Sequence, residues 1–448
     1  MERALTVAVI GSGPSGFYTA GALLGHKELT VRVDMFERLP TPWGLVRAGV
    51  APDHPKIKSV SAMYEKTAAH ERFRFFGNVE LGSDVTREEL VERYDAVVYA
   101  VGAQADRRLG IDGEDLPGSV SAVDFVGWYN GHPDFRDRTF DLSGRRAVVV
   151  GNGNVALDVA RMLCTPADQL GQTDIADHAL EALRSSSIEE VVVIGRRGAA
   201  QAAFTTAELQ ELSEMAGAAV EVDPDEVSEV SDHEDELGTV AKRNLVVLRE
   251  YADGSATTGA RRVALRFLRS PVEILGEDQV TGIVLGRNEL RTDDEGRAAA
   301  VDTGARETVE TGLVLRAVGY KGVQIPGVAF DESRGTIANS DGRVDGGDRE
   351  YVVGWIKRGP SGIIGTNKKC AADTVKTLVT DLAEIGGGTT ATDPDDVEKW
   401  LRERCPDLVD VDGWSAIDRH ERARGEADGR PRVKLCDREE LLAAASEV

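Results

Sequence analysis

Two glycine-rich runs in this chain have the spacing that binds a dinucleotide pyrophosphate. In the first, Gly11, Gly13 and Gly16 follow an apolar segment in the pattern G-x-G-x-x-G. The first glycine makes a tight turn, the second lets backbone approach the pyrophosphate, and the third lets a helix pack closely on a strand. Glu37 ends the next apolar segment, about 20 residues later, where a carboxylate can bind a ribose hydroxyl. These residues predict a dinucleotide site, against the alternative of an α/β turn that binds nothing.

The second run, residues 151–156, repeats the pattern with Ala156 in the third position, where only a small side chain is needed. Arg196 and Arg197 follow the next apolar segment, where an NAD-binding fold would place an acid. A guanidinium pair suits a 2′-phosphate, because it makes bidentate, charge-assisted hydrogen bonds. We therefore predict NADPH at the second run and FAD at the first. The alternative is a solvated arginine pair at the end of a strand.

Buried strands, each followed by a turn and a helix, must position these residues. Apolar runs predict strands at 5–10, 31–36, 75–81, 94–101, 147–150, 191–194 and 351–353, and helices at 58–70, 205–216 and 369–384. The fold class is therefore α/β, with two Rossmann-like dinucleotide-binding domains. Similar strands end at Gly102 and Gly319, and we interpret them as the links between an inserted domain and its host.

The remaining segments carry weaker patterns. The acidic stretch 221–237 predicts a loop or mobile surface, and 386–396 a flexible hinge. Helices near 394–404 and 437–446, each preceded by an aspartate, predict a C-terminal helical appendage.

Composition excludes several classes of function. The 448 residues include 53 basic and 77 acidic side chains, a net charge of −24, which argues against nucleic acid or an anionic membrane as partner. No apolar run approaches the roughly 18 residues of a membrane span, and a first strand beginning near Leu5 leaves no room for a signal peptide. We therefore expect a cytoplasmic protein, with a monomer favoured. The four cysteines form no C-x-x-C pair, so we predict no metal site or redox dithiol.

Four longer motifs carry a family resemblance. They are residues 42–47 (Pro-Trp-Gly-Leu-Val-Arg), 49–55 (Gly-Val-Ala-Pro-Asp-His-Pro), 151–158 (Gly-Asn-Gly-Asn-Val-Ala-Leu-Asp) and 354–360 (Gly-Trp-Ile-Lys-Arg-Gly-Pro). They strongly resemble adrenodoxin reductase, and most closely the bacterial NADPH–ferredoxin reductases of that type. The resemblance implies a split FAD domain (1–103 and 320–385) with an NADPH domain (104–319) inserted in it. Residues 386–448 follow as the appendage.

The resemblance also implies the residues that contact each cofactor. Besides the glycines, it places FAD contacts on Ser15, Glu37, Leu45, Leu81, Trp355, Gly362, Ile363 and Ile364. It places NADP contacts on Asn152, Gly153, Asn154, Val155, Arg196, Arg197, Glu208 and Gly362.

The chemistry that follows is hydride transfer from NADPH to the flavin, with electrons then passed singly to a ferredoxin. His54 and Glu211 are the candidate polar pair near the nicotinamide, since the family has a comparable His and Glu there. His54 would position the carboxamide or stabilise changing charge, and Glu211 would orient His54. The pair would assist and not be essential, because hydride transfer needs no general acid. The alternative for His54 is a histidine that anchors its loop to backbone.

An acidic ferredoxin would require a basic patch around the flavin edge. The candidates are Lys56, Lys58, Lys242, Arg243, Arg261, Arg262, Arg266, Lys357 and Arg358, each of which is otherwise ordinary solvated surface. Three other functions stay open. The missing C-x-x-C disfavours a disulfide reductase, whereas a flavin monooxygenase and a non-catalytic NADPH-sensing flavoprotein need tests of activity.

Overall fold

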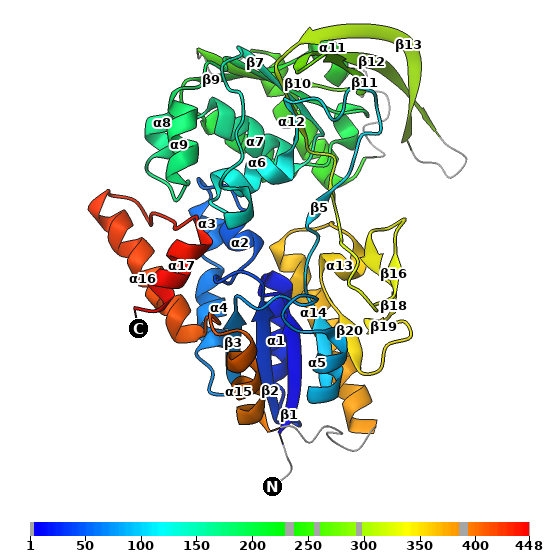
Figure 1. The fold of residues 1–448 in the computed structure, drawn as a ribbon. Helices are drawn as coiled ribbons and strands as arrows, with labels where there is room; N and C mark the ends of the chain where they lie inside the picture. Colours follow the sequence, from blue (N-terminus) through cyan, green and yellow to red (C-terminus); the bar gives the residue numbers. More distant parts are fainter. Residues whose placement is uncertain (1–3, 229–236, 255–259, 293–297, 385–392, 448) are drawn as a thin grey trace. The chain divides into compact units, whose positions relative to one another are not determined.

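The computed structural model describes residues 4–228, 237–254, 260–292, 298–384 and 393–447. The chain divides into two compact units (Figure 1). Unit 1 comprises Met1–Ala105 and Tyr320–Val448, and unit 2 is the insertion Asp106–Gly319. Unit 1 has a mostly parallel sheet with an antiparallel edge, unit 2 has a parallel sheet, and helices flank both, which confirms the predicted α/β class with Rossmann-like domains.

The sheet of unit 1 has seven strands in the order β18-β19-β20-β4-β1-β2-β3. Central β1 pairs in parallel with β2 on one side and with β4 on the other, so a ligand site is expected at its carboxyl end. The strands are β1 (Leu5–Ile10), β2 (Val31–Glu37), β3 (Phe73–Gly77), β4 (Ala96–Tyr99), β18 (Asn339–Ser340), β19 (Arg343–Val344) and β20 (Glu350–Val352). The short strands β16 (Phe330–Asp331) and β17 (Thr336–Ile337) pair with each other, as do β5 (Ala105–Asp106) and β15 (Tyr320–Lys321).

Apolar side chains cover both faces of this sheet. Alternate residues of β1 point to opposite faces, so Val7 and Val9 join one core cluster while Ala8 and Ile10 join the other. Helix α14 packs against α1 (Figure 1). The helices of unit 1 are α1 (Pro14–Leu24), α2 (Leu45–Ala48), α3 (Pro55–Lys58), α4 (Ser61–Ala68), α5 (Arg87–Arg93), α13 (Trp355–Arg358), α14 (Ile364–Glu384), α15 (Pro394–Arg404), α16 (Val411–Ala427) and α17 (Arg438–Ala445).

Unit 2 repeats the arrangement with a six-stranded parallel sheet in the order β6-β14-β7-β8-β10-β9. Its strands are β6 (Ser119–Ser121), β7 (Arg146–Val150), β8 (Glu190–Ile194), β9 (Ala218–Val222), β10 (Arg261–Arg266) and β14 (Leu313–Arg316). An antiparallel sheet of β11 (Arg269–Gly276), β12 (Val280–Thr292) and β13 (Ala298–Glu310) packs on it, burying Ile283 and Leu285 against Val148 and Val150. The helices are α6 (Ala122–Tyr129), α7 (Asn154–Cys164), α8 (Ala167–Leu170), α9 (Asp177–Arg184), α10 (Thr206–Glu211), α11 (Pro224–Ser228) and α12 (Thr239–Ala252).

Some predicted elements differ from the structure. The helix expected at 58–70 is broken into α3 and α4. The stretch 221–237 is not a loop throughout, because it includes the end of β9 and helix α11, where buried Glu226 accepts a hydrogen bond from the Phe267 N–H (2.6 Å). Its residues 229–236, like 386–392 of the expected hinge, lie outside the described residues. Helix α16 was not predicted.

The described C-terminal residues 393–447 pack on unit 1. Leu401 of α15 joins the core cluster on one face of the sheet, and Trp414 of α16 joins the cluster on the other. Gly77 at the end of β3 exchanges two backbone hydrogen bonds with Val409 (2.7 and 2.9 Å). This segment is therefore part of the body of unit 1.

Candidate functional site

The glycine turn of unit 1 lies at the carboxyl end of β1. Gly11 has φ +104°, a conformation that favours glycine, and a Cβ on Gly16 would lie closer than 3.0 Å to the Gly11 carbonyl oxygen. Gly13 differs, because a Cβ there would have no described atom within 4 Å. The turn is closely packed at its first and third glycines and open at the second, which is the geometry that admits a pyrophosphate to the backbone.

Glu37 is fixed beside this turn at the end of β2. One carboxylate oxygen accepts hydrogen bonds from the Ser12 N–H (3.1 Å) and the Ser12 hydroxyl (2.6 Å), and the other accepts from the Leu39 N–H (3.1 Å). These bonds hold the carboxylate where the ribose of a dinucleotide on the turn would lie.

Residues 39–55, which we call the covering loop, pack over the turn. The Trp43 N–H donates to the Ser12 carbonyl (3.0 Å), and a Cβ on Gly44 would lie 2.9 Å from the Gly13 Cα. Trp43 has φ +84°, a strained conformation for a bulky residue, which the surrounding structure must hold in place. Leu45 follows at the start of α2 with 38% of its surface exposed. The loop therefore presents an apolar side chain beside the open turn.

The segment after β20 returns to the same end of the sheet. Gly354 has φ +77°, and a Cβ on it would lie closer than 3.0 Å to the Ser15 hydroxyl in the first turn of α1. Trp355 begins α13, and its ring centroid lies 5.6 Å from that of Tyr320.

The other residues predicted to contact FAD lie around the N-terminus of α14 and beyond β3. Gly362 and Ile363 directly precede α14, which Ile364 begins, and 64% of Ile363 is exposed. Exposed Ile363 and Leu45 provide apolar surface of the kind that a flavin ring covers. Half-buried Leu81 bridges to Val85 in the turn that follows β3.

The glycine turn of unit 2 has the same geometry. Gly151 has φ +131°, and a Cβ on it would lie closer than 3.0 Å to the Ala317 carbonyl oxygen. A Cβ on Gly153 would have no described atom within 4 Å, so this turn is also open at its second glycine. Asn154 begins α7, and its side-chain oxygen accepts from the Thr205 N–H (2.8 Å).

The first residues of this turn lie against the end of β8. The Asn152 side chain packs so closely on Gly195 that a Cβ there would clash with it, and Val155 follows in the first turn of α7. Arg196 and Arg197 come next after Gly195, with Arg196 exposed and Arg197 half-buried.

The backbone of this arginine pair is fixed while its guanidinium groups stay available. The Arg196 carbonyl accepts from the Asn288 amide (2.8 Å), and the Arg197 carbonyl accepts from the Leu268 N–H (3.0 Å). Within the described ranges, no acidic side chain forms an ion pair with either guanidinium group. An anion such as a 2′-phosphate is the partner that this geometry suits.

Glu208 and Glu211 lie one turn apart on α10 and share a partner that the sequence analysis missed. Buried Arg161 of α7 places one guanidinium nitrogen 3.7 Å from Glu208 and 3.6 Å from Glu211, and another 2.6 Å from Asp158. Asp158 and Arg161 are three residues apart in the sequence, as are Glu208 and Glu211. This i, i+3 spacing on a helix could have indicated that each pair lies close together.

His54 belongs to unit 1, whereas Glu211 belongs to unit 2. His54 is buried at the N-terminus of α3, and its Nε2 lies 3.9 Å from the Asp53 carboxylate. The pairing of His54 with Glu211 stays a prediction.

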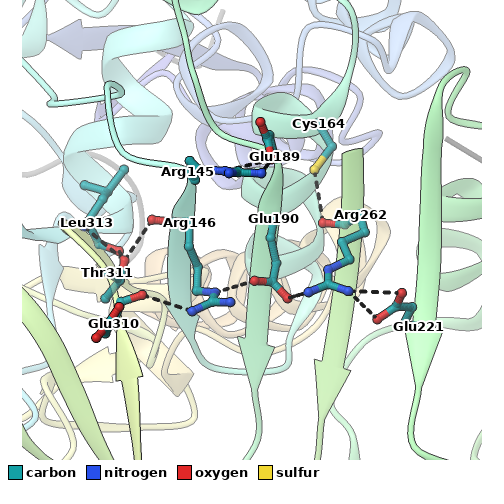
Figure 2. A network of polar contacts seen from close by, with 10 residues as sticks. All are labelled: Arg145, Arg146, Cys164, Glu189, Glu190, Glu221, Arg262, Glu310, Thr311 and Leu313. Carbon is teal, nitrogen blue, oxygen red and sulfur yellow. Dashed lines mark hydrogen bonds and ion pairs between the residues drawn. The ribbon is translucent and has the colours of Figure 1, made fainter. Parts of the chain in front are cut away.

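Arginines of one predicted basic cluster form ion pairs with acidic side chains of the same unit. Figure 2 shows Arg262 of β10 between Glu190 of β8 (2.6 Å) and Glu221 of β9 (3.4 Å), while Glu190 also pairs with Arg146 of β7. Arg266 likewise pairs with Glu307 (3.4 Å). Arg261 and Arg262 stand at the amino end of the parallel sheet, opposite the glycine turn. They are therefore poor candidates for a ferredoxin-docking patch.

Lys357 and Arg358, another predicted docking pair, make contacts within unit 1. The Lys357 ammonium donates to the Thr374 hydroxyl (2.9 Å), and Arg358 donates to the Asn367 side chain (2.8 Å). Lys56 and Arg243 are exposed, and Lys58 and Lys242 are half-buried. None of the helices in the described ranges has the length and apolarity needed to cross a membrane.

Residues 5–252 match the family model described as pyridine nucleotide-disulphide oxidoreductase. NADPH-ferredoxin reductase FprA of Mycobacterium leprae is 58% identical over 445 residues, covering 97% of each chain. The mitochondrial NADPH:adrenodoxin oxidoreductase of Salvelinus fontinalis is 44% identical over 453 residues, covering 98% of this chain and 91% of its own. The solved structure of Mycobacterium tuberculosis FprA in complex with NADPH is 56% identical with a TM-score of 0.96, covering 99% of this chain and 100% of that one.

Proposed function

Because this chain belongs to the adrenodoxin reductase-type NADPH–ferredoxin reductases, within the pyridine nucleotide-disulphide oxidoreductase family, we propose that it carries electrons from NADPH through FAD to a ferredoxin. The observation that carries the proposal is the pair of glycine turns, each open at its second glycine. One turn is flanked by the Glu37 carboxylate and the other by the guanidinium groups of Arg196 and Arg197.

In this proposal, unit 1 binds FAD. The backbone at Gly13 and the N-terminus of α1 receive the pyrophosphate, and Glu37 binds the ribose. Apolar side chains and the segment before α14 surround the ring system; the residues are Leu45, Leu81, Trp355, Gly362, Ile363 and Ile364. When bound, the flavin accepts hydride from the nicotinamide and releases electrons one at a time.

Unit 2 binds NADPH in the same proposal. The backbone of residues 152–155 receives the pyrophosphate, and Arg196 and Arg197 select the 2′-phosphate that distinguishes NADPH from NADH. Glu208 is held by Arg161, which is buried and fixes the carboxylates of α10. His54 positions the nicotinamide carboxamide, Glu211 orients His54, and neither exchanges a proton in the hydride step.

A ferredoxin is the electron acceptor that we propose for this chain, since a relative of 58% identity is named for one. A cytoplasmic location and a monomeric state stay predictions from the sequence.

Anaerobic mixing of the purified, FAD-loaded full chain with NADPH tests the proposal. We expect NADPH to bleach the flavin absorbance at once, and NADH to bleach it much more slowly. Added oxidised ferredoxin should then restore the absorbance. Bleaching that only oxygen reverses, with hydroxylation of an added substrate, would indicate a monooxygenase, and no bleaching would indicate a sensor.

A further inference from the structure

The C-terminal segment contacts the covering loop through a buried ion-pair network. The Glu421 side chain on α16 is fully buried, with 0% exposed, and its two oxygens accept from the Arg47 guanidinium at 2.9 and 2.5 Å. Arg47 stands in α2, two residues after Leu45. The pair therefore joins residues 374 positions apart in the sequence and ties α16 to the covering loop.

Every remaining acceptor site of Glu421 is also used by the C-terminal segment. The Arg432 guanidinium donates at 3.1 Å and the Leu435 N–H at 2.9 Å. Lys434 crosses back and donates from its ammonium group to the Arg47 carbonyl (3.1 Å). Burial by itself raises the pKa of Glu421, but the charges and hydrogen bonds of Arg47 and Arg432 outweigh it and hold that pKa below its ordinary value.

Aromatic packing on the same face of α16 reaches the strained part of the covering loop. Trp414 lies two helical turns before Glu421, so both side chains point to the same side of the helix. The Trp414 ring meets the Trp43 ring edge to face, with centroids 4.8 Å apart and planes at 80°. The Arg47 guanidinium lies 5.5 Å from the Trp414 ring centroid.

These contacts act on the part of the covering loop that borders the glycine turn. Trp43, with its positive φ, donates to the Ser12 carbonyl, and Gly44 lies against the Gly13 Cα. In Figure 1, α16 and α17 lie beside α2. Strain of this kind persists only where the surrounding structure determines the backbone, and here Trp414 and Glu421 supply that constraint.

We propose that α16 fixes the covering loop over the FAD turn, and that Glu421 and Trp414 are positioning residues for FAD. The inference rests on the proposed function of unit 1. It gives residues 411–435 a role in binding the flavin, although none of them stands among the predicted FAD contacts. A buried ion pair is weak evidence for stability alone, and its better attested use is to specify one arrangement.

The test compares Glu421→Gln with a matched control, Glu350→Gln. Glu350 begins β20, its side chain is also 0% exposed, and it accepts hydrogen bonds from Arg87 and from the Tyr99 hydroxyl (2.6 Å). No described contact joins Glu350 to the covering loop. Both variants remove the charge of a fully buried carboxylate that accepts hydrogen bonds from an arginine, so both should lower the melting temperature of the full chain.

The readout is the dissociation constant of FAD, measured by flavin fluorescence on the deflavinated full chain. We expect Glu421→Gln to raise it at least tenfold and Glu350→Gln to leave it within threefold of the wild-type value. Trp414→Phe, which keeps an aromatic ring, should raise it about threefold and decides the matter if Glu421→Gln does not fold. Equal effects of Glu421→Gln and Glu350→Gln, or an unchanged constant in Trp414→Phe, would overturn the inference. A wild-type chain that binds no FAD would instead refute the proposed function.

Discussion

The substitution Gly13→Ala adds one methyl group, whose effect on the stability of the protein can be measured separately from its effect on FAD binding. Gly13 has φ −75°, which any residue adopts, and a Cβ there meets no described atom within 4 Å. Alanine restricts the unfolded chain, and this loss of unfolded-state entropy stabilises the folded protein by roughly 0.4–1 kcal/mol. It is also a poorer N-cap than glycine by about 0.5–1 kcal/mol. The two effects oppose each other, so the free energy of unfolding of the cofactor-free chain should change by less than about 1 kcal/mol.

The same substitution should weaken the binding of FAD. The added methyl group occupies the open face of the turn, where the proposed function places the pyrophosphate of FAD. Overpacking by a methyl group costs about 1–3 kcal/mol, which corresponds to about a 5- to 150-fold rise in the dissociation constant. Gly153→Ala in unit 2, with φ −100° and the same open surroundings, should weaken NADPH binding instead and leave FAD binding unchanged.

The assay combines urea unfolding of the deflavinated chain with a fluorescence titration of FAD. Gly16→Ala is the control, because its Cβ would clash with the Gly11 carbonyl and should destabilise the chain whether or not FAD is bound. An unchanged FAD affinity in Gly13→Ala would refute the location of the pyrophosphate. A loss of stability as large as that in Gly16→Ala would refute the open geometry of the turn.

Three further predictions concern NADPH, the nicotinamide site and a buried thiol. Replacing Arg196 and Arg197 by alanine should raise the NADPH Kd about 10- to 150-fold, since one hydrogen bond to a charged group contributes about 1.5–3 kcal/mol; a titration in which the NADH Kd rises equally would contradict a role in binding the 2′-phosphate. His54→Ala should slow NADPH-driven flavin reduction at least several-fold in stopped-flow experiments, and an unchanged rate would remove His54 from the mechanism. Burial raises the pKa of Cys164 to about 12, so this thiol should resist iodoacetamide at pH 8 in the native chain and react in urea. Because the native chain keeps this proton, its free energy of unfolding should fall as pH rises above the ordinary thiol pKa of about 8.5, and a rise there would contradict the burial.

Local patterns in the sequence predicted the fold and the two turns well, because strand, glycine turn and helix are contiguous. Gly11 and Gly151 need a positive φ, and that need can be read from the spacing alone. The acid or arginine pair at the end of the following strand is also a local signal, and it supports the assignment of the cofactors.

Interactions between distant residues could not be predicted in the same way. Arg261, Arg262 and Arg266 form a basic run in the sequence, but the parallel sheet brings Glu190 and Glu221 beside Arg262. Nothing near Arg47 in the sequence indicates Glu421, which only the packing of α16 places beside it. The sequence therefore predicts the cofactor-binding residues better than it predicts the distant residues that position them.

The most direct test of the account is a reductase assay of the full chain with a panel of ferredoxins, run anaerobically with NADPH and with NADH. We expect at least one acidic ferredoxin to be reduced, with a higher kcat/KM for NADPH than for NADH and a rate that falls as salt rises. Rapid flavin reduction by NADPH without electron transfer to any ferredoxin would contradict the account.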